Sequence, residues 1–566
     1  MEVSRTSKIV QVVTLICISI WSFGSNVSSE NLAFTIARCK PKEVHIAYGE
    51  STSEMVVVWS TDDQCGPSNV QFSLNPWGPF ETAPGESTLF EDTAGLKNYF
   101  HRVKIRDLKP ESNYFYKPNS QGVPVGPYIF KTPPASAGSN EAHFLVVSDV
   151  SSTYPSVPTL HREAATGKFA SILHAGNIAM NLSSANGERG NIFFQAMEPA
   201  VKAVPYMVAP GPNEQEDGTY KHYLQRFSMP LLDWPMKTYQ MWYSIDIGPV
   251  HLISYSTEVF STGQGQEERQ HDWLIRDIKL ANRNRENVPW VVAFGHSPMY
   301  CSYEDPKLTC NKKTSDIKKG LEDIFYRYGA DIIIQSYGAA YERSFPQFKG
   351  VPVNDNYTNP LGPVHIITGG ASPWEMEYNF TETQPDWCAF RYTNKSVMSY
   401  GRLHIVNASH AEYEQVNSEN QEVLDSFTIT QIKHGQFSIE DLPENISATI
   451  DKNIQDAGGK PGVLNVEEIG EAKDQTRIEQ LLKGDNRNRL IIGIIGGVVA
   501  LVAIVVIFAI RGCRKRRRTT RRWEQMDINY GKKFYSKAPD KEEDNDFEID
   551  MSDGTEGTRT LLNSGD

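Results

Sequence analysis

Short runs of hydrophobic residues, separated by turn-forming residues, fill the first part of the chain. Between residues 44 and 132 the runs are "EMVVVWST", "NVQFSL", "YFHRVKI" and "NYFYKP", with Gly, Pro and Asn between them. Their regular spacing and the absence of a helical period predict short strands. We therefore expect an all-β sandwich over residues 35–135. The stretch "TPPASAGSN" at 132–140 has the composition of a linker.

From residue 141 to about 431 the pattern changes to longer apolar runs that alternate with helical segments, such as 267–284. The runs are "HFLVVSD", "ASILHAG", "YMVAPG", "VHLISYST", "PWVVAFGHS" and "ADIIIQS", and each ends in small or polar residues. Continuous apolar runs are typical of strands that helices cover on both faces. An α/β layer domain over 141–433 is therefore expected, with its chemistry at the strand ends.

Two apolar segments near the ends of the chain predict targeting and membrane anchoring. Residues 9–21 are largely apolar, follow Arg5 and Lys8, and lead into a small polar stretch, which is the pattern of a secretory signal peptide within residues 1–29. Residues 490–510 carry no charge and are long enough to form a single transmembrane helix. Eight Lys and Arg residues within 511–522 follow, so we expect the tail 511–566 to be cytoplasmic.

This topology places the large N-terminal part outside the cytosol, as in a type I membrane protein of the plasma membrane or of endosomal or lysosomal membranes. The polar segment 434–489 is low in aromatic residues and is predicted to be a stalk. A buried core helix followed by a nucleic-acid-binding basic run is the alternative, and the membrane-length span disfavours it. The net charge of −13 likewise argues against nucleic acid as a partner.

Glycosylation signals agree with an ectodomain outside the cytosol. Asn-x-Ser/Thr sequons accept glycans only on the secretory side of the membrane, on a surface. Six occur in the predicted ectodomain, at Asn181, Asn356, Asn379, Asn394, Asn407 and Asn445.

The cysteines also fit an oxidising compartment. Five of the seven lie between the predicted signal peptide and the membrane span, and an odd number leaves one thiol free or bonded to another chain. Cys39 with Cys65 would tie the first external segment, and Cys301 with Cys310 would close a short loop. Cys388 is then left over, and it is the candidate for a disulfide-linked homodimer.

The strand ends of the α/β domain carry a recognisable series of residues. "VVSDV", "HAGNIAMNL", "APGPNEQ", "VVAFGHSPMYC" and "IIIQSYGAAYER" follow one another along the chain. Their order and neighbouring letters resemble the metallophosphoesterase superfamily, and most closely the purple acid phosphatases, which read GDxG, GDxxY, GNHE, VxxH and GHxHxYER. The resemblance extends from about residue 44 to 431 and includes connecting stretches such as "YERSFP".

The resemblance implies a fold and a cofactor. The N-terminal sandwich would be the fibronectin type III-like domain that commonly precedes the catalytic domain in this family. The α/β domain would be a metallophosphatase-like, four-layer αββα sandwich. Family members are acid phosphatases with a binuclear centre of Fe with Fe, Zn or Mn, held by seven side chains.

Most of the metal-ligand positions in this pattern carry other residues. In the family an aspartate bridges the two ions, because a carboxylate offsets and links two cations, and here that position is Asn177. The remaining substituted ligand positions are Met180 for the iron-binding tyrosine, Pro212 for an asparagine, and Tyr337 and Ala339 for two histidines.

Two ligand positions keep the family residue. They are Asp149 and His296, and the resemblance assigns them to different metal ions. Asn213 stands where the family has a histidine that assists the substrate or leaving group, and Glu214 follows it. Catalytic metal sites normally need about three protein ligands, so neither shell would be complete, and no other catalytic motif, such as a P-loop or HExxH, replaces them.

We therefore expect a pseudoenzyme with no metal cofactor. Such an ectodomain would bind an unknown extracellular or luminal ligand, as a receptor or binding protein does. The alternative is a working acid phosphatase that hydrolyses phosphomonoesters with a binuclear or improvised metal site, for example one built from Asp149, His296, Asn213 and Tyr337.

Overall fold

The computed structural model describes residues 36–459, without 93–94, 96, 136–140, 153–154, 216–218, 263–265, 305–309, 337, 339–340, 372–378 and 395. The predicted signal peptide (1–29), transmembrane helix (490–510) and cytoplasmic tail (511–566) lie outside this part of the chain. Among the helices that the structure describes, none is long and apolar enough to cross a membrane.

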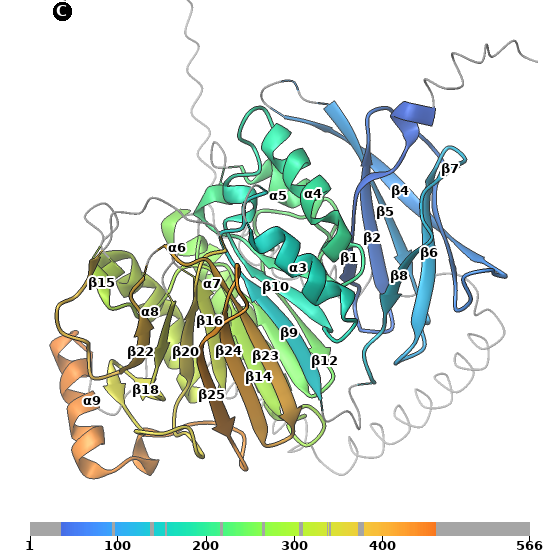
Figure 1. The fold of residues 1–566 in the computed structure, drawn as a ribbon. Coiled ribbons are helices and arrows are strands. Elements are labelled where there is room, and N and C mark those ends of the chain that lie inside the picture. Colours follow the sequence, from blue (N-terminus) through green and yellow to red (C-terminus); the bar gives the residue numbers. More distant parts are fainter. Residues whose placement is uncertain are drawn as a thin grey trace, which may run out of the picture. The chain divides into compact units, whose positions relative to one another are not determined.

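The N-terminal domain is built from antiparallel strands in the order β1-β2-β5-β4-β3-β6-β7, with β8 also paired to β6 (Figure 1). The long strand β4 pairs with β5 along one part and with β3 along the other, so it belongs to both layers. This arrangement agrees with the predicted all-β domain. The strands are β1 (Lys42–Tyr48), β2 (Met55–Thr61), β3 (Ser68–Ser73), β4 (Glu81–Glu91), β5 (Lys97–Ile105), β6 (Asn113–Ser120), β7 (Val123–Pro124) and β8 (Tyr128–Lys131).

Two sheets form the centre of the α/β domain. The first has the order β11-β10-β9-β23-β24-β25, and the second has the order β12-β13-β14-β16-β20-β17-β22. The first contains β9 (Ala142–Val147), β10 (Ser171–Ala175), β11 (Tyr206–Ala209), β23 (Ser399–Asn407), β24 (His410–Asn417) and β25 (Val423–Thr430). The second contains β12 (Tyr243–Ile247), β13 (Val250–Ser254), β14 (Trp290–Phe294), β16 (Ile332–Ser336), β17 (Tyr341–Ser344), β20 (Val364–Thr368) and β22 (Cys388–Tyr392).

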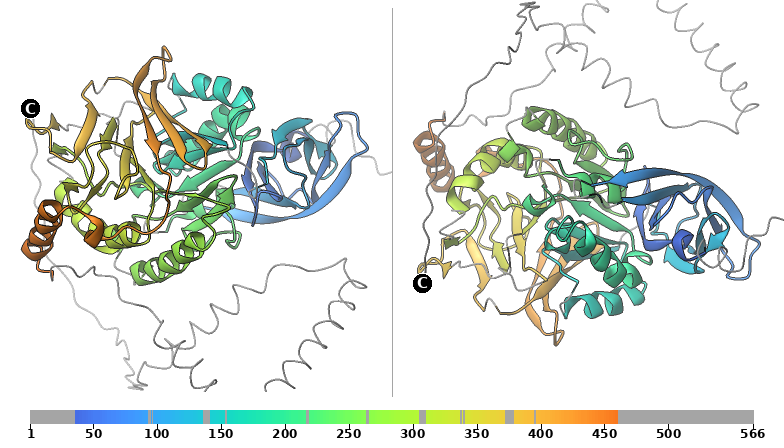
Figure 2. Two further views of the ribbon diagram at one scale, coloured as in Figure 1. Left: turned by 90° about the horizontal axis from the view of Figure 1, so that it is seen from below. Right: turned by 90° about the horizontal axis from the view of Figure 1, so that it is seen from above.

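Helices cover the outer faces of the sheets (Figures 1 and 2). Along β14, Trp290, Val292 and Phe294 pack into the core shared with the first sheet, whereas Val291 and Ala293 pack under the helices. This alternation follows from the two-residue period of a strand and gives helix, sheet, sheet and helix layers. The helices are α3 (Ser156–Ala165), α4 (Glu188–Val201), α5 (Lys221–Arg226), α6 (Val259–Thr262), α7 (Gln266–Asn282) and α8 (Cys310–Arg327), and the predicted helix 267–284 corresponds to α7.

Short elements connect these layers. Three are single 3-10 turns: η1 (Ile178–Met180), η2 (Pro212–Glu214) and η3 (Ile439–Asp441). Small strand pairs are formed by β15 (Tyr303–Glu304) with β21 (Asn379–Phe380), and by β18 (Gln347–Phe348) with β19 (Val351–Pro352).

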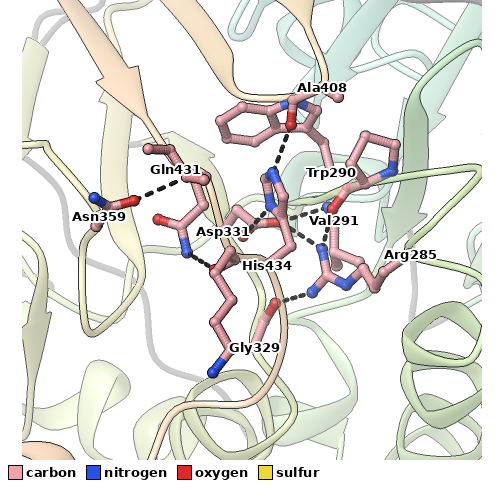
Figure 3. A network of polar contacts seen from close by, with 12 residues as sticks. Arg285, Trp290, Val291, Gly329, Asp331, Asn359, Ala408, Gln431 and His434 are labelled. Atoms are coloured by element: carbon pink, nitrogen blue, oxygen red, sulfur yellow. Dashed lines mark hydrogen bonds and ion pairs between the residues drawn. The ribbon is translucent and has the colours of Figure 1, made fainter.

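The start of the predicted stalk is folded, which corrects the boundary at residue 434. His434 Nδ1 lies 3.2 Å from Asp331 Oδ1 and its ring packs edge-on against Trp290. Asp331 also accepts hydrogen bonds from Arg285 Nη1 at 2.6 Å and from the Val291 backbone at 2.7 Å (Figure 3). Beyond it, α9 (Glu444–Asp456) buries Ile450 and Ile454 in a small core with Tyr326 and Phe348. Residues 460–489 lie outside the described residues.

A buried ion pair joins the two domains. Arg226, at the end of α5, is fully buried and donates through Nη1 to Glu43 of β1 at 2.7 Å. Its Nη2 donates to Asn191 Oδ1 at 2.6 Å, and its guanidinium lies over the rings of Phe100 and Phe194. The charge is therefore neutralised where the sandwich meets the α/β domain.

Cys39 and Cys65 form the predicted disulfide. Cys301 is also disulfide-bonded, and because the Cys310 side chain lies outside the described residues, the Cys301–Cys310 pairing stays a prediction. Cys388 is a free thiol in β22 with 3% of its surface exposed. A buried thiol is poorly placed to reach a second chain, which disfavours Cys388 as the residue that links a homodimer, and the covalent homodimer itself stays a prediction.

Cys388 should resist alkylation in the native protein. Burial and the neighbouring Glu342 carboxylate raise the pKa of the thiol, and the thiolate is the reactive form. We expect iodoacetamide at pH 8 to leave Cys388 unmodified in the native chain and to modify it fully after denaturation. Mass spectrometry of the peptide that contains Cys388 measures both. Native labelling as fast as that of N-acetylcysteine would contradict the buried position.

His251 should stabilise the fold only when it is protonated. Its Nδ1 lies 2.7 Å from Asp246 Oδ1 and its Nε2 lies 3.0 Å from Asp277 Oδ2 of α7. Burial opposes the charge, but the Asp277 and Asp246 carboxylates outweigh it and raise the pKa to about 9. Since the unfolded value is near 6.5, the ion pairs contribute fully below that pH and are lost as the pH rises through about 9.

His251→Gln should therefore lower the free energy of unfolding by about 2–3 kcal/mol at pH 6 and by much less at pH 10. Urea unfolding of both proteins across this range measures the difference. A difference that stays constant with pH would show that His251 acts by packing alone.

Candidate functional site

The strand ends of the two sheets bring the predicted positions together. Asp149 follows β9, Asn177 follows β10, and Asn213 lies on η2 after β11. β9, β10 and β11 are parallel neighbours, so these three residues share one edge. His296 follows β14, and Ser336 ends the parallel neighbour β16. Their side chains meet Asp149 and Asn177 in one buried cluster.

The amide of Asn177 is at the centre of this cluster. Its Nδ2 donates to Asp149 Oδ1 at 2.7 Å and lies 3.1 Å from His296 Nε2. Its Oδ1 accepts a hydrogen bond from the backbone N–H of Asn213 at 3.0 Å. The Asp149, Asn177 and His296 side chains are nearly fully buried. One neutral side chain thus connects the residues that follow four different strands.

The partners of Asn177 and His296 allow only one assignment of hydrogens. Asp149 accepts and the Asn213 N–H donates, so the NH₂ group of Asn177 must face Asp149. His296 Nδ1 lies 2.7 Å from the carbonyl oxygen of Ala175 and must carry the proton. His296 Nε2 therefore presents its lone pair to Asn177 Nδ2, and every polar atom of this group is satisfied.

Ser336 completes the surroundings of Asp149. Its hydroxyl donates to Asp149 Oδ2 at 2.7 Å, so both carboxylate oxygens have a partner within the cluster. No sequence motif marks Ser336 as a site residue. The signal is its place at the end of the predicted strand, two residues after the apolar run 332–334, where a small hydroxyl residue can bond across neighbouring strand ends.

The Glu214 carboxylate accepts hydrogen bonds from the backbone of the loops around Asn177. Its Oε2 accepts hydrogen bonds from the N–H groups of Asn177 at 2.9 Å and Gly211 at 2.7 Å, and its Oε1 accepts one from Ile178 at 2.7 Å. Burial raises the pKa of Glu214 to about 8, against the effect of these three donors. Both oxygens of the Glu214 side chain thus bind the backbone of these loops.

Close packing and unusual backbone conformations accompany these contacts. Asp149, Asn177, Ala179 and Met180 have φ values of 50°, 57°, 59° and 62°, which are unfavourable for side-chain-bearing residues and concentrate at functional sites. A Cβ on Gly176 would lie 2.8 Å from His296 Nδ1. The loops therefore keep a strained, tightly packed geometry.

The other substituted positions offer little to a cation. Met180 is buried, Pro212 is half-buried, and neither side chain has a ligand atom that suits iron, zinc or manganese in an oxygen- and nitrogen-rich site. Tyr337 and Ala339 lie outside the described residues.

The described residues do not fit the family's metal centre. Asp149 Oδ1 and His296 Nε2, which belong to the two positions that keep the family's ligand residue, both face the same amide NH₂. The NH₂ group of Asn177 directs its two N–H bonds at the lone pairs of these two atoms, in the place where a cation would otherwise bind them. Asn177 also lacks the negative charge that two adjacent cations require.

Comparisons with known proteins identify the domains. Three family profiles match: "Purple acid Phosphatase, N-terminal domain" over residues 41–132, "Calcineurin-like phosphoesterase" over 142–336, and "Iron/zinc purple acid phosphatase-like protein C" over 362–426. The chain is 36% identical to acid phosphatase type 7 of Homo sapiens over 401 residues, which cover 67% of this chain and 88% of that protein.

More distant proteins show the same likeness. Phosphoenolpyruvate phosphatase of Allium cepa is 27% identical over 408 residues, covering 69% of this chain and 81% of that protein. A solved purple acid phosphatase from yellow lupin (Lupinus luteus) seeds has a TM-score of 0.59 at 18% identity, covering 69% of this chain and 75% of that chain. At that identity the likeness concerns the fold alone.

Proposed function

The chain belongs to the purple acid phosphatase family, and from that premise we propose that it is a member that binds a ligand instead of hydrolysing phosphate esters. The observation that carries the proposal is the NH₂ group of Asn177, which contacts both Asp149 Oδ1 and His296 Nε2. The two remaining ligand atoms of the family pattern are engaged by a neutral amide. A metal-bound hydroxide, which such hydrolases use as the nucleophile, has no site to form on.

The buried strands and the hydrogen-bonded cluster support a chain that keeps the family fold but lacks phosphatase activity. The strands beneath the cluster are fully buried. The side chains at the family's metal-ligand positions Asp149, Asn177 and His296 are hydrogen-bonded to one another. Loss of buried charged ligands together with their cations leaves no cluster of unpaired carboxylates. The loops and the outer surface of the ectodomain thus remain available as a rigid scaffold for an extracellular or luminal ligand.

Placement in the secretory pathway is part of the proposal. It is supported by the Cys39–Cys65 disulfide, since such bonds persist in oxidising compartments. Four predicted glycan acceptors have exposed side chains, namely Asn356, Asn379, Asn394 and Asn445, whereas Asn181 and Asn407 are half-buried. We propose that residues 490–510 anchor this ectodomain in the plasma, endosomal or lysosomal membrane.

A second candidate function is acid phosphatase activity. It is favoured by the names of the relatives, "Acid phosphatase type 7" and "Phosphoenolpyruvate phosphatase". It would require the Asn177 side chain to turn away and additional ligands to enter from residues such as Asn213.

Hydrolysis of para-nitrophenyl phosphate at acid pH distinguishes the two functions. We expect the purified protein to show no turnover above buffer, with or without added iron, zinc or manganese, because uncatalysed phosphomonoester hydrolysis is extremely slow. Human acid phosphatase type 7, prepared in parallel, is the positive control. Turnover that is abolished both by a chelator and by His296→Ala would overturn the binding proposal in favour of a phosphatase.

A further inference from the structure

A cluster of two histidines and a glutamate lies at the other end of the first sheet. His143 is the second residue of β9, and Asp149 lies just past the end of that strand, so the two clusters are about 20 Å apart at the usual rise of a strand. Glu141 immediately precedes β9, and His404 belongs to β23, which lies beside β9 (Figure 1). None of these residues belongs to the family pattern of strand-end motifs.

Strand pairing places the two histidines face to face. His143 and His404 are direct partners in the antiparallel register of β9 and β23, where side chains stand on the same face. Their imidazole rings stack with centroids 3.9 Å apart and an interplanar angle of 10°. The sheet therefore fixes the separation of the rings without help from a flexible loop.

Both histidines point the same nitrogen at one carboxylate oxygen. His143 Nε2 lies 2.9 Å and His404 Nε2 lies 3.1 Å from Glu141 Oε1. Ligand atoms that share a tetrahedral zinc ion at about 2.1 Å are separated from one another by about 3.4 Å. The nitrogen-to-oxygen distances are within about half an ångström of this value, and all three candidate ligand atoms lie within 4.8 Å of one another.

A second carboxylate, that of Glu412, lies where it can orient His404 as a metal ligand. His404 Nδ1 lies 3.3 Å from Glu412 Oε2 of the neighbouring strand β24, and a carboxylate on the second ring nitrogen orients a metal-bound imidazole. The histidine side chains are 28% and 26% exposed, so an ion could reach them from solvent.

We propose that Glu141, His143 and His404 form a surface site for one divalent transition-metal ion of the zinc type, with Glu412 as a positioning residue for His404. Imidazole and carboxylate ligands suit this class of ion. In the bound state each imidazole is a neutral ring with its proton on Nδ1, so Nε2 gives its lone pair to the ion. A proton held on Nε2 before binding moves through solvent to Nδ1, or leaves to solvent if Nδ1 already carries one, while Glu141 changes from hydrogen-bond acceptor to ligand. The site is separate from the cluster around Asn177 and does not rest on the loss of phosphatase activity.

Zinc titration of the full-length, tag-free protein tests this site. The protein is purified in detergent, stripped with a chelator and titrated with zinc chloride in competition with a chromogenic chelator. We expect one bound equivalent in the wild type, loss of that equivalent in His404→Ala, and roughly tenfold weaker binding in Glu412→Gln. His271→Ala, which removes a histidine of α7 outside the cluster, should bind zinc like the wild type.

Two further variants keep the test decisive. If His404→Ala does not fold, as judged by circular dichroism, Glu141→Gln removes a ligand from a side chain that is 61% exposed and should weaken binding at least tenfold. His296→Ala should leave the zinc equivalent in place. Absence of zinc binding by the wild type, binding that persists in His143→Ala/His404→Ala, or binding lost only in His296→Ala would each overturn the proposal.

Discussion

Asn177→Asp should lower the free energy of unfolding by about 3–5 kcal/mol at neutral pH, because it places an uncompensated charge in a buried cluster. The new carboxylate oxygen would replace an NH₂ group that donates to Asp149 Oδ1 at 2.7 Å and faces His296 Nε2 at 3.1 Å. Two carboxylates would then face each other with little solvent and no cation between them. Asparagine and aspartate have nearly the same shape, so the change tests charge and hydrogen bonding and not volume.

Urea unfolding followed by circular dichroism measures this effect. Asn186→Asp is the matched control, because it makes the same chemical change at an exposed residue nine positions further along the chain and should alter stability by less than about 0.5 kcal/mol. Equal stability of Asn177→Asp and the wild type would mean that the pocket still accommodates a bridging carboxylate, and therefore a metal.

Glu43→Ala should destabilise the protein by about 3–5 kcal/mol, since it leaves the buried guanidinium of Arg226 without its counter-charge. Arg226 Nη1 lies 2.7 Å from Glu43 Oε2, and both side chains are almost completely buried. Asn191 and the surrounding aromatic rings cannot neutralise the cation. Differential scanning calorimetry of the full chain should show a lower unfolding temperature.

A double variant separates the charge from the packing at this interface. Glu43→Leu/Arg226→Met removes both charges and fills the space with apolar atoms, so it should be considerably more stable than Glu43→Ala. Lys42→Ala, which removes the partly exposed neighbour that pairs with Asp62, should change stability by no more than about 1 kcal/mol. If Glu43→Ala were as mild as Lys42→Ala, the ion pair would not hold the domains together.

Six strands of the α/β domain were predictable because each carries its own signal. The run "ADIIIQS" predicts a buried strand that ends near Ser336, and the structure places β16 at Ile332–Ser336. Apolar runs of this length cannot be accommodated on a surface, and the parallel strands β9, β10 and β11 then bring their ends to one edge. The resemblance to the purple acid phosphatases, together with the expectation of chemistry at the strand ends, places Asp149 and Asn177 in one site.

The contacts within the site were not predictable. Asn177 bonds to residues 28 and 119 positions away in the chain, and a sequence shows the loss of a ligand but not what fills its place. The folded segment after residue 434 was missed for a related reason. Its apolar residues are few, and Ile450 and Ile454 stabilise α9 only because Tyr326 and Phe348 lie opposite them.

The proximity of His143 and His404 was likewise not predictable from the sequence. Their cross-strand pairing joins residues that are 261 positions apart in the numbering, and neither residue lies in a recognisable motif. Only the register of β9 against β23 brings them together with Glu141.

Elemental analysis of the purified protein tests the central claim most directly. The full chain carrying His143→Ala/His404→Ala, which removes the proposed surface site, is purified without chelators and measured for iron, zinc and manganese by mass spectrometry. The account predicts metal well below one equivalent per chain, because the amide of Asn177 occupies both remaining ligand atoms. One or two equivalents that disappear in the additional variant His296→Ala would show that the family's metal centre is still assembled.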